Sequence, residues 1–262
     1  MANINVIIEG AEGKSHFRLW EEINRHIYKG RLTLISSFGF SNIIKVLKDR
    51  YNASDLFIID IDNSLDNTAV VNELIELSIY MEYKLNVFNL GLQCFEDTML
   101  SFNSLKEWVY SSETRRSKLI EYRCSVLDAY RASSNKWDYN DVLAEFIVKV
   151  AHKNKDEVHL VNKEHLASYV LSNFTYNSGF RVTKGDFGDC WSEGCYSEKC
   201  GITCKPNMPK HRVCGLHEIC SLCSREKIEH IYRYTKLNDA MAKCKETFIS
   251  AGYNLAEDIV VI

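Results

Sequence analysis

The chain lacks the features that would assign it at once to a membrane or a strongly basic class. No stretch approaches the roughly 18 apolar residues that span a membrane, and the N-terminus has neither a basic start nor a long apolar segment. We therefore expect a cytoplasmic protein without a membrane partner. The 32 Lys and Arg residues face 35 Asp and Glu residues, which gives a formal net charge of -3. Any affinity for nucleic acid must then come from a local patch, from metal-bridged phosphate contacts or from a partner subunit.

Proline is scarce, and no internal repeat or low-complexity segment appears. The composition, 46% hydrophobic and 26% charged, is ordinary for a folded protein, and 262 residues suffice for one full domain with a small appendage. Strand-like and helix-like patterns alternate over about the first 110 residues, which predicts an α/β fold with a parallel sheet flanked by helices. The expected strands lie near residues 4–9, 32–37, 55–61 and 85–90.

Helical spacing separates the expected strands and continues beyond them. Phe17, Trp20, Ile23 and Ile27 recur at intervals of three or four, which predicts one buried helix face after the first strand. From about residue 92 to 175 only helical periodicity remains, so a helical extension follows the sheet.

Carboxylates follow two of the expected strands. Glu9 and Gly10 end the first strand, and Asp60, Asp62 and Asn63 end the third. Residues two apart in a strand point to one face, so Asp60 and Asp62 can approach one ion, and Glu9 can join them if the two strands are neighbours. Converging carboxylates repel one another unless a cation lies among them, and oxygen ligands favour Mg²⁺ or Mn²⁺ over zinc.

These segments, with Ser36–Ile44 between them, resemble the Toprim domain of topoisomerases, bacterial primases and OLD-family nucleases. The resemblance covers roughly the first hundred residues. It implies that Glu9, Asp60 and Asp62 hold Mg²⁺ and supply the general acid or base for phosphodiester chemistry. Many Toprim sequences have an aspartate where this chain has Gly13, so the first helix is expected to begin differently here.

The resemblance implies a Mg²⁺-dependent nuclease that hydrolyses DNA or RNA, with tRNA among the candidate substrates. A type IA topoisomerase or a replicative primase needs large further domains, whereas the size of this chain is similar to that of stand-alone Toprim effectors of bacterial anti-phage defence, such as the effector of PARIS. By that analogy a regulatory ATPase is a candidate partner, as is a second copy of the chain. Glu96, Lys14 and Lys45 are further candidate catalytic residues.

Other interpretations of the acidic residues remain open. They can simply cap the helices that follow the strands. Gly13-Lys14-Ser15 resembles the end of a Walker motif, with Asp60 as its partner acid, which would indicate a nucleotide-binding switch; the glycine required five residues earlier is Ile8. A non-catalytic Toprim and zinc module for nucleic-acid binding or assembly is the third alternative.

Cysteines are concentrated near the C-terminal end, where seven of the ten lie within 34 residues together with both prolines. Such a loop-rich segment has little apolar material, and structural Zn²⁺ bound by thiolates would supply the missing folding energy. Cys220 and Cys223 are the strongest pair, because a Cys-x2-Cys turn points both sulfurs at one ion. One zinc, two zincs, or free or redox-active thiols remain alternatives. The candidate ligands are Cys190, Cys195, Cys200, Cys204, Cys214, Cys220 and Cys223, with His211 and His217 as further candidates.

We expect four segments: a Toprim domain at 1–112, a helical extension at 113–178, a cysteine-rich module at 179–225, and a C-terminal helix and tail at 226–262. The extension contains a basic stretch from Arg115 to Arg131, which indicates equally a solvated helix face or a phosphate track. The apolar end at 259–262 is expected to add a strand or to dock on a partner.

Overall fold

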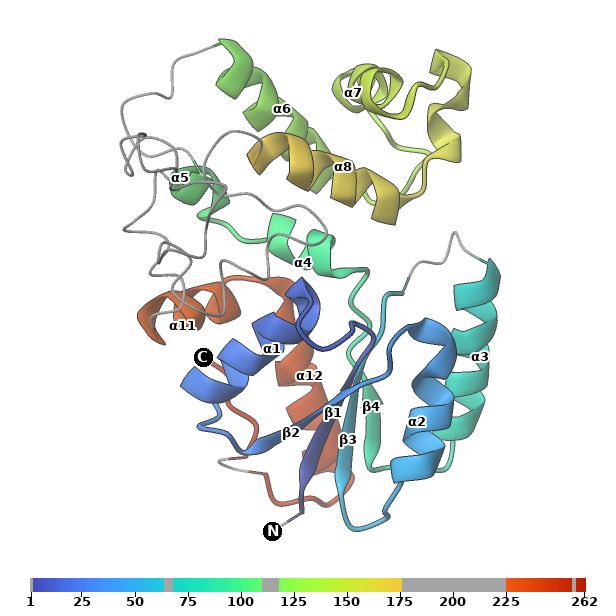
Figure 1. Ribbon diagram of the computed structural model, residues 1–262, viewed down its shortest axis with the longest axis vertical. Helices are drawn as coiled ribbons and strands as arrows, with labels where there is room; N and C mark the ends of the chain where they lie inside the picture. The colour runs from blue at the N-terminus through green and yellow to red at the C-terminus, as the bar shows by residue number, and fades with distance from the viewer. Residues whose placement is uncertain (1, 64–67, 110–117, 176–224, 256–257) are drawn as a thin grey trace.

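The computed structural model describes residues 2–63, 68–109, 118–175, 225–255 and 258–262. In this part of the chain, four parallel strands form one sheet in the order β2-β1-β3-β4 (Figure 1). The strands are β1 (Ile4–Ile8), β2 (Leu32–Ser36), β3 (Leu56–Asp60) and β4 (Val87–Asn89). The predicted α/β class, with a parallel sheet flanked by helices, is confirmed.

The two central strands are apolar almost throughout because helices cover both faces of the sheet. Alternate residues divide between two cores. Ile8 and Ile58 belong to one core, whereas Ile7 and Ile59 belong to the other. Asp60 has the same parity as Ile58, so the last side chain of β3 turns toward the first of these cores.

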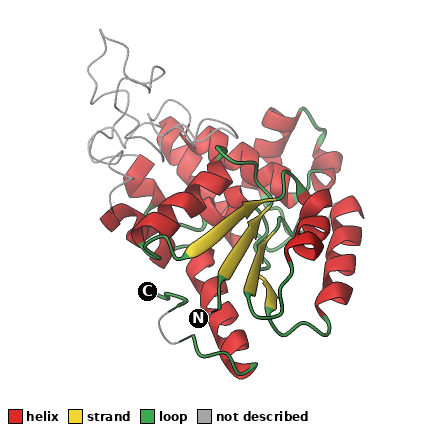
Figure 2. Ribbon diagram, turned by 60° about the horizontal axis from the view of Figure 1, so that its bottom comes forward, coloured by secondary structure: helices red, strands yellow, loops and turns green. Residues whose placement is uncertain are grey.

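Helices lie on both faces of the sheet (Figure 2). The first core is closed by α1 (Ser15–His26), α11 (Arg225–Arg233) and α12 (Lys236–Ser250), and the second by α2 (Ile43–Arg50) and α3 (Thr68–Met81). The spacing of Phe17, Trp20, Ile23 and Ile27 predicted the buried face of α1, and all four are buried. Short 3-10 turns occur at Phe40–Asn42 and Lys155–Leu160.

A layer of helices lies beyond the carboxyl ends of the strands (Figure 1). It contains α4 (Phe95–Leu100), α5 (Leu105–Val109), α6 (Lys118–Ala132), α7 (Asp141–Ala151) and α8 (Lys163–Thr175). Within it, α8 contacts both α4 and α6. The edge of the sheet that carries Glu9 and Asp60 is therefore covered, and any site there is partly enclosed.

The C-terminal tail docks on helices of its own chain and adds no strand to the sheet among the described residues. The hydroxyl of Tyr232 donates to the carbonyl of Val260 at 2.8 Å and lies 2.9 Å from the hydroxyl of Tyr28. Asn238 Oδ1 accepts from the amide of Ile262 at 3.1 Å. The expected strand at 259–262 is thus not formed, because these backbone groups bond to side chains of the helices.

No helix in the described ranges is both long and apolar enough to cross a membrane.

Candidate metal centre

The predicted acidic residues come to the same edge of the sheet because β1 and β3 are adjacent. Ile8 pairs with Asp60 in the parallel register, and the amide of Glu9 donates to the carbonyl of Asp60 at 3.0 Å. The Glu9 carboxylate in turn accepts from the amide of Asp62 at 2.9 Å. The strand order reverses between β1 and β3, and the crevice at such a reversal is where ligands bind in open α/β sheets.

Asp62 reaches this site by a route other than the predicted one. Strand β3 ends at Asp60, so strand alternation does not align the two aspartates. The hydrogen bond from the Asp62 amide to Glu9 positions that segment instead.

Helix α1 holds the Asp60 carboxylate through two side chains one turn apart. The Oδ2 atom of Asp60 lies 2.7 Å from Nε2 of His16 and accepts from the indole Nε1 of Trp20 at 2.6 Å. Trp20 is fully buried and Asp60 is 2% exposed. These contacts fix Asp60 in one orientation, and among the described residues no hydrogen bond involves its Oδ1.

The charges at this edge are unfavourably crowded. Burial, followed by the charge of Glu9, raises the pKa of Asp62 well above its usual value. Burial also raises the pKa of Glu9, although the hydrogen bond from the Asp62 amide opposes the rise. Burial alone would lower the pKa of His16, but the charge and hydrogen bond of Asp60 outweigh it, so the pKa of His16 rises to about 9. His16 therefore carries a positive charge at neutral pH.

Two more carboxylates contribute to the negative potential at this edge. Glu96 is 8% exposed in the first turn of α4, and its charge raises the pKa of Asp62. Glu164, near the start of α8, likewise raises the pKa of Glu9. Glu96 thus lies near the triad as expected, whereas Glu164 was not expected, because no sequence pattern places the helical layer over this edge.

The two candidate lysines lie apart from the acidic residues. Lys14 is exposed immediately before α1, where its amide donates to the carbonyl of Ala11 at 3.0 Å. Helix α1 begins at Ser15 without a side-chain cap hydrogen bond. Lys45 is exposed on α2, on the opposite face of the sheet from α1, and lines a pocket with Asp49. In the described part of the chain neither lysine contacts the acidic site.

The chemistry of the acidic residues suits a divalent cation, but their present positions do not form a site for one. Partly buried carboxylates with raised pKa values are the donors that a cation would stabilise, and their oxygens suit Mg²⁺ or Mn²⁺. However, no three His, Cys, Asp or Glu side chains converge into a ready-made metal cage anywhere in the described ranges. A metal would require the carboxylates to turn toward a common point.

The sequence contained a signal for the two residues that hold Asp60. A buried Trp usually needs an acceptor for its indole N–H, and the four-residue spacing places His16 on the same face of α1 as Trp20. The sequence interpretation used Trp20 only as an apolar core residue, so its polar role was missed.

The predicted zinc site lies outside the described residues. This applies to all seven candidate cysteines and to His211 and His217, so the zinc module stays a prediction.

Comparisons of the chain with protein-family models, with curated proteins and with solved structures found no match.

Proposed function

We propose that this protein is a metal-dependent nuclease of the Toprim type that uses Mg²⁺ or Mn²⁺ to hydrolyse phosphodiester bonds in DNA or RNA, tRNA included. One observation carries the proposal: the adjacent strands β1 and β3 deliver Glu9, Asp60 and Asp62 to the same partly enclosed edge. Burial and mutual repulsion raise the pKa values of Glu9 and Asp62 there, which is the electrostatic situation that a bound cation relieves.

Glu9, Asp60 and Asp62 would hold the metal, with Glu96 close to Asp62. A divalent ion bound in this way lowers the pKa of an attacking water and neutralises charge on the leaving oxygen. His16 and Trp20 keep the Asp60 carboxylate in place through its Oδ2 atom. Such outer contacts orient a metal ligand and tune its basicity.

The Toprim resemblance also gives the acidic triad the role of general acid or base. A carboxylate that holds the cation is ionised, because the ion lowers its pKa, so proton transfer would fall to a member of the triad that does not coordinate the metal at that step. We also propose, from that resemblance, that the nuclease serves anti-phage defence and is restrained by an ATPase partner.

The test is cleavage of labelled plasmid DNA and total tRNA with Mg²⁺ or Mn²⁺ by the wild type and the folded variants Glu9→Ala and Asp60→Ala. We expect both variants to lose at least 100-fold in rate, because preorganised electrostatic groups of this kind contribute about 10²–10³ each. Glu76→Ala is the matched control, since Glu76 is a carboxylate on the other face of the sheet with its side chain 59% exposed. Equal cleavage by all four proteins would contradict the proposal.

The second candidate function is a non-catalytic nucleic-acid-binding or assembly module. Its support is that Asp60 already has a cationic partner in His16, so the site does not depend on a metal for charge balance at that residue. This alternative predicts that neither Mg²⁺ nor Mn²⁺ stabilises the protein against unfolding. It also predicts that expression of the wild type is no more toxic than expression of Glu9→Ala.

A further inference from the structure

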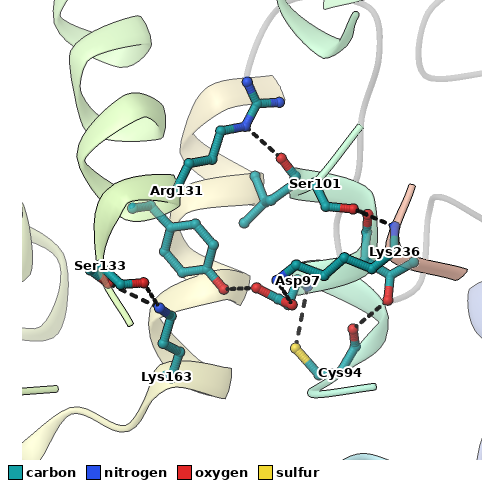
Figure 3. A network of polar contacts seen from close by, with 10 residues as sticks. Cys94, Asp97, Ser101, Arg131, Ser133, Lys163 and Lys236 are labelled. Atoms are coloured by element: carbon teal, nitrogen blue, oxygen red, sulfur yellow. Dashed lines mark hydrogen bonds and ion pairs between the residues drawn. The ribbon is translucent and has the colours of Figure 1, made fainter. Parts of the chain in front are cut away.

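Helix α4, which carries Glu96 near the acidic edge, also contributes to a second polar site. It is a pocket of about 260 Å³ between α4, α6, α8 and the start of α12. Figure 3 shows its polar side chains, which come from segments far apart in the chain; Lys236 reaches Asp97 and Lys163 reaches Ser133, whereas the Arg131 guanidinium points away from both lysines. The residues that carry the argument are Asp97, Arg131, Ser133, Lys163 and Lys236.

Three cationic side chains line this pocket, and Asp97 is the carboxylate among its lining residues. Lys236 Nζ lies 2.7 Å from Asp97 Oδ2, while the Tyr130 hydroxyl donates to Asp97 Oδ1 at 2.7 Å. Lys163 is only 8% exposed, yet its hydrogen-bond partners are the neutral carbonyl and hydroxyl of Ser133. The pocket therefore carries an excess of positive charge in a chain that is negative overall.

Arg131 adds the third positive charge to the pocket lining. Its Nε donates to the carbonyl of Leu100 at 2.8 Å, and one terminal nitrogen donates to the carbonyl of Phe102 at 2.6 Å. The guanidinium points away from the ammonium groups of Lys163 and Lys236 (Figure 3), so it contributes charge to the pocket rather than a direct donor. The two backbone bonds hold the guanidinium in a fixed position without neutralising it.

The lysines also keep unused donors. Each ammonium has three N–H bonds; Lys163 uses two on Ser133, and Lys236 uses one on Asp97. Burial lowers the pKa of Lys163; the charge of Asp97 opposes this effect, and the charge of the nearby Lys236 adds to it. A buried ammonium group whose direct partners are neutral is costly, and an oxyanion in the pocket would reduce that cost.

We propose that this pocket binds a phosphate group through Lys163 and Lys236, with the Ser133 hydroxyl as a further donor and the charge of Arg131 adding to the positive potential. Two ammonium groups and a hydroxyl offer several donors, which suits a phosphate's several oxygens. The phosphate belongs to a nucleic-acid backbone or to a free nucleotide, and both sources offer the same oxyanion.

The pocket's place in the fold favours the backbone source. Asp97 follows Glu96 on α4, and Lys163 precedes Glu164 on α8, so the same two helix turns contribute to both sites. A strand whose scissile phosphate lay at the acidic edge would thus have a neighbouring phosphate near the pocket. The assignment to a nucleic-acid backbone rests on the proposed nuclease function, whereas the binding of a phosphate group by the pocket does not.

The experiment measures binding without catalysis. Calorimetric titrations in EDTA use inorganic phosphate, a nucleoside monophosphate and a short oligonucleotide, with sodium chloride of equal ionic strength as the blank. The proteins are the wild type, Lys236→Met, Lys163→Met and the control Lys48→Met. Lys48 is a suitable control because its side chain is 50% exposed and ion-paired, similar to Lys236 at 55%, but it lies on α2.

We expect both pocket variants to bind phosphate at least tenfold more weakly than the wild type, with Lys48→Met unchanged, since each removes a charge-assisted hydrogen bond. For the oligonucleotide, the slope of log K against log salt should fall by about 0.7–0.9 in Lys236→Met, which corresponds to one lost phosphate contact. If Lys236→Met kept the oligonucleotide slope of the wild type but bound the nucleoside monophosphate more weakly, the pocket would be assigned to a free nucleotide.

Equal affinities in all four proteins, or no binding of any probe by the wild type, would overturn the proposal. If Lys163→Met fails to fold, a phosphate titration of the wild type followed by amide chemical shifts takes the place of that variant. Phosphate must then shift the amide signals of Ser133 and Ser101 rather than those of the acidic edge. Because binding is measured in EDTA, a failed cleavage assay leaves this result intact, and failed phosphate binding leaves the nuclease assay intact.

Discussion

Replacing His16 by Gln tests whether Asp60 depends on a cationic partner. Asp60 has a side chain only 3% exposed, and His16 contacts its Oδ2 at 2.7 Å. Breaking a buried ion pair by removing one partner typically costs about 3–5 kcal/mol, because the other charge is left uncompensated. Gln keeps an N–H donor and Trp20 still donates to Asp60, so we expect His16→Gln to lower the free energy of unfolding by about 2–3 kcal/mol.

The assay is urea unfolding, supported by thermal melts. For a chain of this size the expected loss corresponds to a fall in melting temperature of about 4–12 °C. The pKa of His16 is raised from 6.5 to about 9, so its charge contributes fully below pH 6.5 and its contribution is lost as the pH rises through 9. The deficit of His16→Gln should therefore be largest near pH 6 and disappear above pH 9.

A double-mutant cycle and metal titration sharpen this test. Asp60→Asn combined with His16→Gln removes both charges, and the pair should cost less than the two single changes summed, by about 1–3 kcal/mol. If a metal binds Asp60, Mg²⁺ at 100 times its dissociation constant should restore about 2.7 kcal/mol to His16→Gln. That gain should exceed the gain of the wild type, because the imidazolium no longer opposes the ion.

The control is His165→Gln, since His165 is exposed on α8 and should change stability by less than about 0.5 kcal/mol. A loss below about 0.5 kcal/mol in His16→Gln would refute the ion pair as the support of Asp60. Failure of both Mg²⁺ and Mn²⁺ to stabilise any variant would refute the metal site.

Three further changes test other parts of the structure. Burial raises the pKa of Glu22 from 4.5 to about 7, so its favourable contribution to stability is complete below pH 4.5 and is lost as the pH rises through 7. The free energy of unfolding of Glu22→Gln, measured in urea, should therefore rise by about 1–3 kcal/mol relative to that of the wild type between pH 4.5 and 8.5. Tyr232→Phe removes the 2.8 Å donor of the Val260 carbonyl, which keeps the 3.2 Å bond from the Tyr28 hydroxyl, so the change should cost about 0.5–1.5 kcal/mol in the same assay. Phe38 has a left-handed backbone (φ 57°) and a ring 66% exposed beside the Glu9 loop. Phe38→Gly should keep or slightly raise stability, by up to about 1 kcal/mol, while weakening oligonucleotide binding about fivefold or more through loss of stacking.

Each of these expectations has a result that would count against it. A pH-independent difference for Glu22→Gln would mean that burial does not disfavour its charge. Tyr83→Phe, whose ring is 85% exposed, should be neutral, and a similar loss in both tyrosine variants would remove the case for the Tyr232 hydrogen bond. Unchanged oligonucleotide affinity in Phe38→Gly would exclude stacking at that ring.

The sheet could be predicted from the sequence because its cause is local. Each expected strand is a short apolar run bounded by turns, and Glu9 and Asp60 lie where such runs end. Their meeting could not be predicted in the same way, since it depends on β1 and β3 being neighbours. The expected alternation between Asp60 and Asp62 was wrong in detail, because the strand ends at Asp60 and a backbone hydrogen bond to Glu9 holds the next segment.

The contacts made by the helices depend on tertiary packing and left weaker signals. His16 and Trp20 share a helix face, but only the position of α1 over β3 turns that face toward Asp60. Glu164 reaches the acidic edge because α8 packs on α4, a contact between segments about 70 residues apart that no short pattern encodes. Arg131 appeared in the sequence as part of a basic stretch, but the two lysines that line the pocket with it come from α8 and α12.

The two sites would account for the opposite charges at consecutive positions of α8, Lys163 and Glu164. Glu96 and Glu164 raise the negative potential at the acidic edge, which a metal ion would need, but the same potential repels a phosphate. Positive charge a single residue away, at Lys163 and around Asp97, can hold a neighbouring phosphate without entering the acidic site. Reversing this arrangement by Lys163→Glu should therefore weaken the binding of any phosphate-bearing substrate even when the metal is bound, because the ion neutralises only the edge and not the pocket.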